Sequence, residues 1–376
     1  MSSLTDLLRT PGPMRNLAVL AVVTLFFCIA AAIAVTTQRE ATAIRFEPRP
    51  FFPGLADEVN RATKLVYTTG LGMQGTAQIT IERDDDGVWR VVEREGYPAK
   101  LERVRKTILG LTELEAFEPR TANPEWHRNL GLLEPEELGR AVRVQLFDAE
   151  GNELAGLLAG EVVDASSDLQ GRGFLYVRRD GEDQTWLARG SISLDKDVAG
   201  WLEPEAVSIP LERTRRVTLW AGTDKAVVLS RSSPDHPNFI IENVPDGYLT
   251  RGAPIVNASA TAFSSFEFED AVPASAFTFN DPPVAIVETF DGLKLTLTMT
   301  GSGTGMWATF TAEADHEALS AAQGDEADHA ALDAEVAAIN ARVGDWAYKL
   351  DQNVGLRLTQ TMDQLVRPVA EQPSGR

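Results

Sequence analysis

Residues 77–94 read AQITIERDDDGVWRVVER, and this stretch decides the kind of fold that the rest of the chain can have. Ile79 and Ile81 alternate with polar residues before the acidic run, and Trp89 and Val91 alternate after it. Such alternation is typical of strands with one buried face, and an Asp-Gly pair is a common turn between antiparallel strands. The stretch therefore predicts a β-hairpin whose apolar side chains share one face.

The same residues also come close to the pattern of an EF-hand calcium loop. In a loop that starts at Glu82, Asp84 and Asp86 take the third and fifth positions and Glu93 takes the twelfth. An EF-hand needs a helix on each side, and both flanks here have the period of strands. Glu93 would lie roughly 20 Å along a strand from Gly87, at about 3.3 Å per residue. We therefore expect an acidic turn, with Asp84 and Asp86 as weak candidates for metal ligands only.

Other elements can be predicted on both sides of the hairpin. The β-rich run TKLVYTT at 63–69 precedes it, and apolar residues from Leu101 to Leu111 then recur at helical spacing. This spacing predicts an amphipathic helix over 99–117. Strand patterns follow at 142–148, 153–159, 173–179 and 185–188, and a short helical stretch at 195–202 closes the segment.

The same order of elements recurs in the second half of the chain. A second strand trio reads RVTLW at 216–220, AVVLSR at 226–231 and NFIIE at 238–242. Gly247-Tyr248 follows this trio as Gly96-Tyr97 follows the first. A recurring order of elements at low identity indicates tandem copies of one structural unit.

We therefore expect an α+β fold, in which an N-terminal transmembrane helix precedes two tandem, related units of mainly antiparallel strands with packed helices. The first unit spans 57–208, and the second spans 209–370 with an insertion at 313–342 that contains a helix. Further helices are expected in the second unit, one with Ile255 and Phe266 on its buried face and one over 353–366. Residues 371–376 are expected to form a disordered tail.

The N-terminal region carries one long apolar run, LAVLAVVTLFFCIAAAIAVT at 17–36, without a charged residue. A helix needs about 20 apolar residues to cross a membrane, whereas the apolar part of a secretory signal has about 7–15. We expect an uncleaved single-pass anchor, although Ala32-Ile33-Ala34 resembles a cleavage site. Residues 1–16 then form a short tail and residues 37–56 a proline-containing linker.

Charge and cysteine content bound the partners and the compartment. The chain has 35 Lys plus Arg against 55 Asp plus Glu, a net charge of -20, so it would repel a nucleic acid. Arginines lie on both sides of the apolar run, so charge alone does not set the orientation. The single cysteine, Cys28, lies within that run, and a domain without thiols suits an exported compartment. We expect a bacterial inner-membrane protein with the bulk of the chain in the periplasm.

Motifs that carry chemistry in other proteins are weak in this chain. Residues 70–75, GLGMQG, match GxGxxG, but a strand rather than a helix follows, so the motif predicts a glycine hairpin. His316 and His329 each follow Ala-Asp and are weak candidates for a zinc or manganese site with Asp315 and Asp328. No cofactor is expected.

Carboxylates offer one catalytic alternative. Glu93 and Glu95 share a strand face, and Glu242 lies at the corresponding place in the second copy. Paired carboxylates catalyse hydrolysis when a cleft shifts their pKa values, but beside a turn they are usually solvated surface charges. No catalytic residue is therefore assigned.

Several stretches together resemble a known family. They are GLADEVNRATKLVYTT at 54–69, WRVVEREGYPAKLERVRKTILGLTELE at 89–115, NLGLLEP at 129–135, FLYVRR at 174–179, WLARG at 186–190, WLEPEAVSIPLERTRRVTL at 201–219 and, more loosely, WAYKLDQNVGLRLTQTMDQLV at 346–366. They are similar to the bacterial domain-of-unknown-function 4340 family. The resemblance implies a membrane-anchored envelope protein, encoded beside ABC-type transport components similar to those of gliding-motility exporters, and it supplies no catalytic residues.

On this resemblance we expect a non-catalytic envelope protein that serves as an accessory or scaffold component of an ABC-type transport system. Its expected partners are membrane lipid, through residues 17–36, and a transporter permease or other envelope proteins. Two alternatives remain open: an envelope hydrolase acting on a polymer, and a polymer-binding module with exposed aromatic residues on one sheet face.

Overall fold

The computed structural model describes residues 20, 22–30, 47–164, 173–264, 266–301, 305–324 and 327–369. The chain divides into two compact units, Met1–Arg49 and Pro50–Arg376. In the first unit, Leu20 and residues 22–30 are helical, and nowhere in the described ranges is a helix long and apolar enough to cross a membrane. The rest of the predicted span at 17–36, the predicted tails at 1–16 and 371–376, and residues 37–46 of the predicted linker lie outside these ranges.

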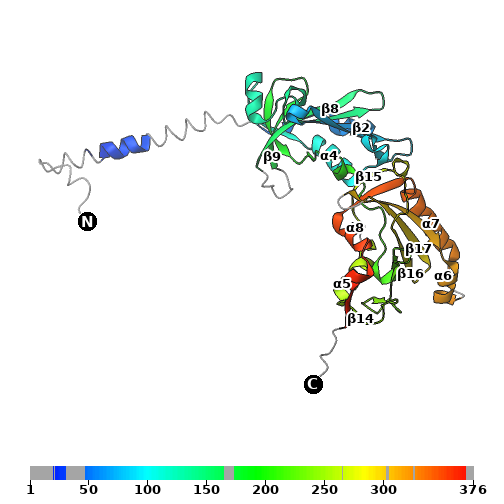
Figure 1. Cartoon of the computed structure of the whole chain (residues 1–376). Coiled ribbons are helices and arrows are strands. Elements are labelled where there is room, and N and C mark those ends of the chain that lie inside the picture. Colours follow the sequence, from blue (N-terminus) through cyan, green and yellow to red (C-terminus); the bar gives the residue numbers. More distant parts are fainter. Residues whose placement is uncertain are drawn as a thin grey trace. The chain divides into compact units, whose positions relative to one another are not determined.

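Antiparallel sheets with packed helices make up the second unit, which confirms the α+β class (Figure 1). The first sheet has the order β1-β6-β10-β9-β8-β7-β2-β3-β4-β5. Its strands are β1 (Arg49–Pro50), β2 (Ala62–Gly70), β3 (Thr76–Arg83), β4 (Trp89–Val91), β5 (Tyr97–Pro98), β6 (Glu115–Pro119), β7 (Val142–Asp148), β8 (Glu153–Asp164), β9 (Gly173–Arg179) and β10 (Thr185–Gly190).

The second sheet has the order β13-β12-β11-β16-β17-β18-β19-β15. Its strands are β11 (Thr214–Leu219), β12 (Val227–Ser230), β13 (Ile240–Ile241), β15 (Phe268–Pro273), β16 (Val284–Thr289), β17 (Leu293–Thr300), β18 (Trp307–Ala314) and β19 (Trp346–Leu350). A separate pair joins β14 (Tyr248–Thr250) to β20 (Val366–Pro368).

The two sheets share one strand order. The series β4-β3-β2-β7-β8-β9-β10-β6 in the first corresponds, position by position, to β13-β12-β11-β16-β17-β18-β19-β15 in the second. In each, one helix links the strand trio to the strand at the far end of that series: α4 (Leu101–Thr112) in the first and α5 (Ala253–Ala260) in the second. Both also have a register shift at the start of their first strand, between Ala62 and Lys64 in β2 and between Thr214 and Arg216 in β11.

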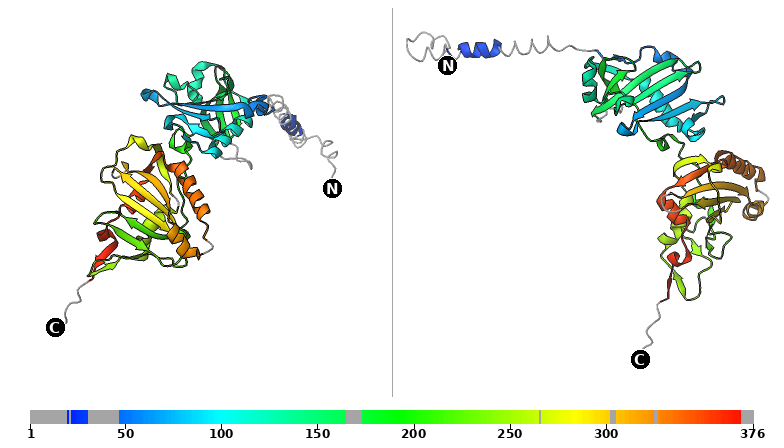
Figure 2. Two further views of the ribbon diagram at one scale, coloured as in Figure 1. Left: turned by 90° about the vertical axis from the view of Figure 1, so that its right-hand side faces the viewer. Right: turned by 45° about the horizontal axis from the view of Figure 1, so that its top comes forward.

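Helices cover these sheets through buried side chains and a few hydrogen bonds (Figure 2). Val104 and Leu111 of α4 are buried, and the Tyr67 hydroxyl of β2 donates to Thr107 Oγ1 at 3.1 Å. The predicted helical insertion forms α6 (His316–Gln323) and α7 (His329–Val343). The Asn340 side chain of α7 forms two hydrogen bonds with the backbone of Ala312 in β18, which fixes α7 against the second sheet.

Several predicted boundaries are wrong, each for a local reason. The helix predicted over 99–117 ends at Thr112, and 115–119 form β6, because Ala116 is buried in the sheet opposite Ala188. The second strand of the hairpin predicted over 77–94 ends at Val91, and a 3-10 turn at Val92–Arg94 follows it. The helical stretch at 195–202 is a 3-10 turn at Ala199–Trp201.

Two predictions for the second unit also need correction. The helix predicted over 353–366 is two short helices, α8 (Gln352–Leu358) and α9 (Met362–Leu365), because a capping box at Thr361 starts a new helix. Ile255 is exposed, and the neighbouring Val256 is buried instead, while Phe266 is buried as predicted.

The end of the predicted linker at 37–56 is also structured, because a short α3 (Leu55–Glu58) begins there. Phe51 and Leu55 from the same stretch are buried.

An aromatic cluster joins the two sheets inside the second unit. The Tyr97 ring lies 5.0 Å from Trp346, 5.8 Å from Phe268 and 6.2 Å from Tyr348, measured between centroids. The Tyr97 hydroxyl donates to the Glu203 carbonyl at 3.1 Å. Burial raises the pKa of Tyr97 to about 12.

Candidate functional site

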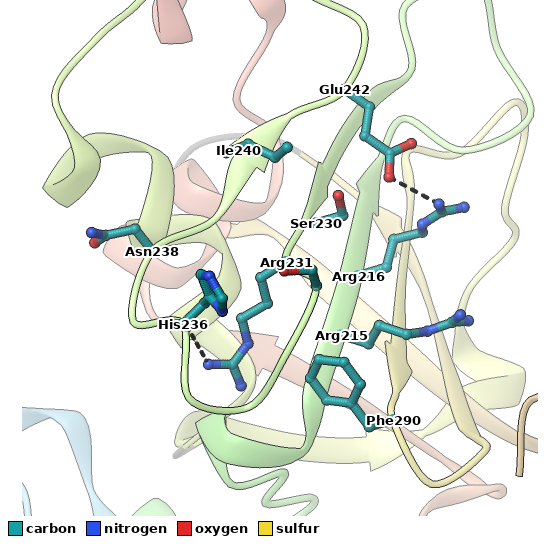
Figure 3. Close-up of a pocket in the computed structure, with 10 residues that line it drawn as sticks. Arg215, Arg216, Ser230, Arg231, His236, Asn238, Ile240, Glu242 and Phe290 are labelled. Atoms are coloured by element: carbon teal, nitrogen blue, oxygen red, sulfur yellow. Dashed lines mark hydrogen bonds and ion pairs between the residues drawn. The ribbon is translucent and has the colours of Figure 1, made fainter. Parts of the chain in front are cut away.

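A pocket of about 410 Å³ opens over the strands at one edge of the second sheet (Figure 3). Its wall comes from β11, β12 and β13 and from the loop between β12 and β13. Three arginines line it, together with serine, histidine, asparagine, glutamate, isoleucine and phenylalanine side chains: Arg215, Arg216, Arg231, Ser230, Ser232, His236, Asn238, Glu242, Ile240 and Phe290. A cluster of arginines is unexpected on a chain with a net charge of -20.

A register shift in β11 places two consecutive arginines at this pocket. Successive side chains of a regular strand point to opposite faces, so Arg215 and Arg216 would normally separate. The pairing with β16 shifts between Thr214 and Arg216, and a bulge of this kind re-aims the extra side chain. Both arginines are half-buried and both line the pocket. Arg216 lies opposite Ser230 of β12, which in turn lies opposite Ile240 of β13.

Arg231 forms the inner wall and holds the loop that follows it. Its side chain donates to four backbone carbonyls: to Thr214 at 2.8 Å, His236 at 2.9 Å, Pro234 at 3.1 Å and Leu211. Only 6% of Arg231 is exposed, and its guanidinium lies over the rings of two phenylalanines. Burial lowers the pKa of this guanidinium, but an arginine stays protonated in proteins.

The charges at the pocket do not balance. Arg216 Nη2 lies 2.9 Å from Glu242 Oε1, and Arg215 Nη2 lies 3.3 Å from Glu288 Oε1. Arg231 contacts neutral carbonyls, and within the described residues no carboxylate forms an ion pair with it. Among the described residues that line the pocket, three are arginines and Glu242 is the carboxylate, while Glu288 and Glu212 act on Arg215 and Arg231 from outside the lining. Arg215 Nε is buried and has no hydrogen-bond partner among the described residues.

This arrangement is suited to holding an anion. Guanidinium groups present paired N–H donors that match the two oxygens of a carboxylate or a phosphate. Catalysis by a nucleophile needs a base within hydrogen-bond reach. The serines that line the pocket, Ser230 and Ser232, form no such contact with His236 in the described part of the chain. What the lining offers is a set of guanidinium donors for an anion.

In the acidic turn of the first sheet, Asp84, one of the two candidate metal ligands, has a structural role. Asp84 accepts hydrogen bonds from Val88 N at 2.8 Å and from Arg90 Nε at 2.5 Å. The hydrogen bond from Arg90 holds the pKa of the Asp84 carboxyl below its ordinary value. Asp86 is exposed at the tip of the turn. The flanks are strands β3 and β4, as expected for a hairpin.

The three carboxylates of the hydrolase hypothesis have separate surroundings. Both oxygens of Glu93 accept from Thr80 N, at 2.9 and 2.8 Å, on the first sheet. Glu95 is held in a left-handed turn with φ of 50°. Glu242 pairs with Arg216 on the second sheet. This structure gives no support to acid–base chemistry shared among them.

The two candidate histidines do come together. His316 Nδ1 lies 2.9 Å from His329 Nδ1, and His316 Nε2 lies 3.1 Å from Asp333 Oδ1. The carboxylates predicted to join them do not, because Asp315 and Asp328 cap α6 and α7 by accepting from backbone amides. Across the residues described, no group of three or more His, Cys, Asp and Glu side chains could hold a metal ion.

The glycine motifs lie in turns. Residues 70–75 connect β2 and β3, which are paired antiparallel, so the GxGxxG match precedes a strand and not a helix. This geometry lacks the helix N-terminus that a dinucleotide phosphate needs.

Sequence reasoning missed the pocket. Arg215-Arg216 is a visible pair in a predicted strand, and SSPDHPNF after Arg231 is a visible loop. Neither signal shows that Arg231 is buried and donates to carbonyls. Two of these carbonyls precede it in the sequence, at Leu211 and Thr214, and two follow it, at Pro234 and His236.

Comparisons with known proteins give one match. A family model described as Domain of unknown function (DUF4340) matches residues 89–283. This segment begins at β4, the last strand of the first trio, and includes all of the second trio. It contains every residue that lines the arginine pocket except Phe290. No curated protein and no solved structure matches the chain.

Proposed function

The chain belongs to the DUF4340 family, and we propose that it is a non-catalytic, membrane-anchored envelope protein, an accessory or scaffold component of an ABC-type transport system. Residues 17–36 would hold it in the bacterial inner membrane by a single helix, with the bulk of the chain in the periplasm. The tandem units at 57–208 and 209–370 would present their sheets to a permease or to other envelope proteins.

One observation carries the binding role. The arginine pocket is held in shape by hydrogen bonds from Arg231 to the backbone, and its lining has three arginines with the carboxylate of Glu242. A rigid, positively charged hollow on an acidic protein is a device for selecting a ligand. The shared strand order of the two sheets supports tandem, related units. The buried Arg231 belongs to the second of these units.

A polymer-binding module is the second candidate, and exposed apolar surface at the pocket favours it. Ile240 is 64% exposed on the edge strand β13, and Phe290 lies half-buried across the pocket. Apolar side chains beside polar ones commonly support the ring of a sugar or another flat ligand.

The test of the transport role is a pull-down of the tagged full-length chain from gently solubilised membranes. Recovery of ABC-type permease or ATPase subunits is the expected result. A control bait exchanges residues 17–36 for an unrelated apolar helix of the same length, which separates contacts made by the anchor from those made by the sheets. Recovery of no transporter subunit with the unaltered bait would contradict the proposal.

A further inference from the structure

We infer that the arginine pocket binds the carboxylate of an acidic sugar unit carried by an otherwise neutral saccharide. The inference rests on the proposed binding role of this site and adds the class of its ligand. It follows from the excess positive charge of the lining, from the ion pair that Arg216 already forms with a carboxylate, and from the side chains around the arginines.

The excess positive charge of the lining favours a singly charged anion. Arg215, Arg216 and Arg231 line the pocket with Glu242, and Glu288 and Glu212 act on these arginines from outside the lining. A carboxylate brings one negative charge into this half-buried site, whereas a phosphate dianion brings two and costs more to desolvate. The guanidinium of Arg231 cannot lose its proton to adjust, because an arginine stays charged in proteins.

The pocket already shows how it engages a carboxylate. Glu242 Oε1 accepts from Arg216 Nη2 at 2.9 Å, and both side chains are more than one third exposed, at 37% and 39%. Exposed ion pairs are weak, so an incoming carboxylate can displace Glu242 at little cost. Arg216 then offers its guanidinium to the oxygens of that carboxylate.

The rest of the lining suits a sugar ring. Ser230, Ser232 and Asn238 offer hydroxyl and amide groups that both donate and accept, as sugar hydroxyls do. Ile240 and Phe290 supply apolar surface on opposite sides of these groups (Figure 3). The volume of about 410 Å³ lies within the usual range of small-molecule sites.

The field of the whole protein excludes a continuous polyanion. A net charge of -20 repels a chain with a carboxylate on every unit, and only nearby charges escape screening, within about 8 Å at physiological salt. An isolated carboxylate on a neutral saccharide meets the pocket charge without meeting that repulsion along its length.

The test measures binding to the full-length chain by isothermal titration calorimetry. The probes are methyl glucuronide, its neutral counterpart methyl glucoside, inorganic phosphate and an acetylated glutamate peptide. We expect methyl glucuronide to bind at least about tenfold more tightly than methyl glucoside, which has no carboxylate for the guanidinium groups, and at least about tenfold more tightly than phosphate and the peptide, which have no sugar ring. Arg216→Ala should weaken that binding about tenfold, and Glu242→Gln should tighten it several-fold by removing the internal competitor.

The first sheet provides a matched control pair. Lys64 and Glu82 face each other on β2 and β3 at 2.8 Å, where Arg216 and Ser230 lie in the second sheet, and they are similarly exposed. Lys64→Ala and Glu82→Gln should leave methyl glucuronide binding unchanged.

Four results would overturn the inference. Equal binding of glucuronide and glucoside would remove the carboxylate from recognition, and unchanged binding in Arg216→Ala would remove the pocket. Tighter binding of phosphate, or binding of the glutamate peptide alone, would assign the pocket to another ligand class while leaving the proposed binding role intact. Failure to recover transporter subunits is a separate result, because this titration involves no partner protein.

Discussion

The β3–β4 turn of the first sheet and the β12–β13 loop of the second occupy the same place in the same strand order, yet they are built on opposite charges. The register pairs Lys64 with Glu82 and Arg216 with Ser230, so the next residues, Arg83 and Arg231, are equivalent. Arg83 is exposed, whereas Arg231 is 6% exposed.

The difference lies in which backbone groups each connection turns inward. The first connection is short, at 84–88, and the Asp84 carboxylate accepts from its backbone N–H at Val88. The second is four residues longer, at 231–239, and two of its carbonyls, at Pro234 and His236, accept from Arg231. A guanidinium supplies five donors in one rigid group, so one buried side chain can hold several carbonyls of the loop. One topology therefore yields a solvated hairpin in one copy and a walled pocket in the other.

The largest difference in stability is expected between the variants that remove the two equivalent arginines, Arg231 and Arg83. Arg231→Ala leaves four carbonyls without their donor, at about 1 kcal/mol each, so we expect a loss of about 4 kcal/mol in the free energy of unfolding. Arg83→Ala should stay within about 0.5 kcal/mol, as for most exposed sites. Urea denaturation followed by circular dichroism measures both. Arg231→Lys should lie between them, and equal losses at positions 83 and 231 would refute the comparison.

The equivalent tyrosines extend the same comparison to the joint after each strand trio. Tyr97 is 3% exposed inside the aromatic cluster, and Tyr248 is 43% exposed on β14. Tyr97→Ala should cost about 3 kcal/mol, as for other buried aromatic residues, and Tyr248→Ala less than about 0.5 kcal/mol. Thermal unfolding of the two variants tests this, and a large loss at Tyr248 would contradict the exposure of its side chain.

Local periodicity accounts for what the sequence predicted well. The strands at 142–148 and 173–179 were predicted with their observed bounds, because in each the buried residues follow the alternation of a pleated strand. The hairpin at 77–94 was also predicted, since its turn residues and its alternation agree.

Long-range contacts account for what the sequence missed. The helical spacing continues to Leu114, but Ala116 joins the sheet opposite Ala188, and no local signal marks that change. The pocket depends on Arg231 reaching back to Leu211 and on the register of β11 against β16, both of which arise only when distant strands pair. The two candidate histidines lie together, but the carboxylate that contacts His316 is Asp333 rather than Asp315.

Substitution of the glycines before the two equivalent tyrosines, Gly96 and Gly247, should cause a smaller loss of stability that is similar in both copies. Gly96 and Gly247 have φ of 85° and 82°, a conformation that an L side chain rarely adopts. Gly96→Ala and Gly247→Ala should each cost about 1 kcal/mol. Gly252→Ala is the control, because Gly252 has φ of -55°. Thermal unfolding should give similar shifts for the first two, and a shift at only one of them would separate the joints that the strand order makes equivalent.

The smallest effect depends on pH and returns to the acidic turn. The pKa of Asp84 is lowered in the folded state, chiefly by the hydrogen bond from Arg90, so its carboxylate stabilises the fold above the unfolded pKa of about 3.9. That contribution is lost as the pH falls through the lower, folded pKa. The advantage of the natural chain over Asp84→Asn should therefore be constant from pH 7 to about pH 5 and shrink towards pH 3.

The arginine-built connection predicts the opposite behaviour over the same range. Arg231 stays protonated from pH 7 to pH 3, so the loss in Arg231→Ala should not shrink with acid. Urea titrations at both pH values, with Asp86→Asn as the exposed control, measure these differences. If the Asp84→Asn difference persisted unchanged at pH 3, the turn would owe its shape to its backbone alone. The contrast between an acid-held turn and a guanidinium-held loop would then be wrong for the first copy.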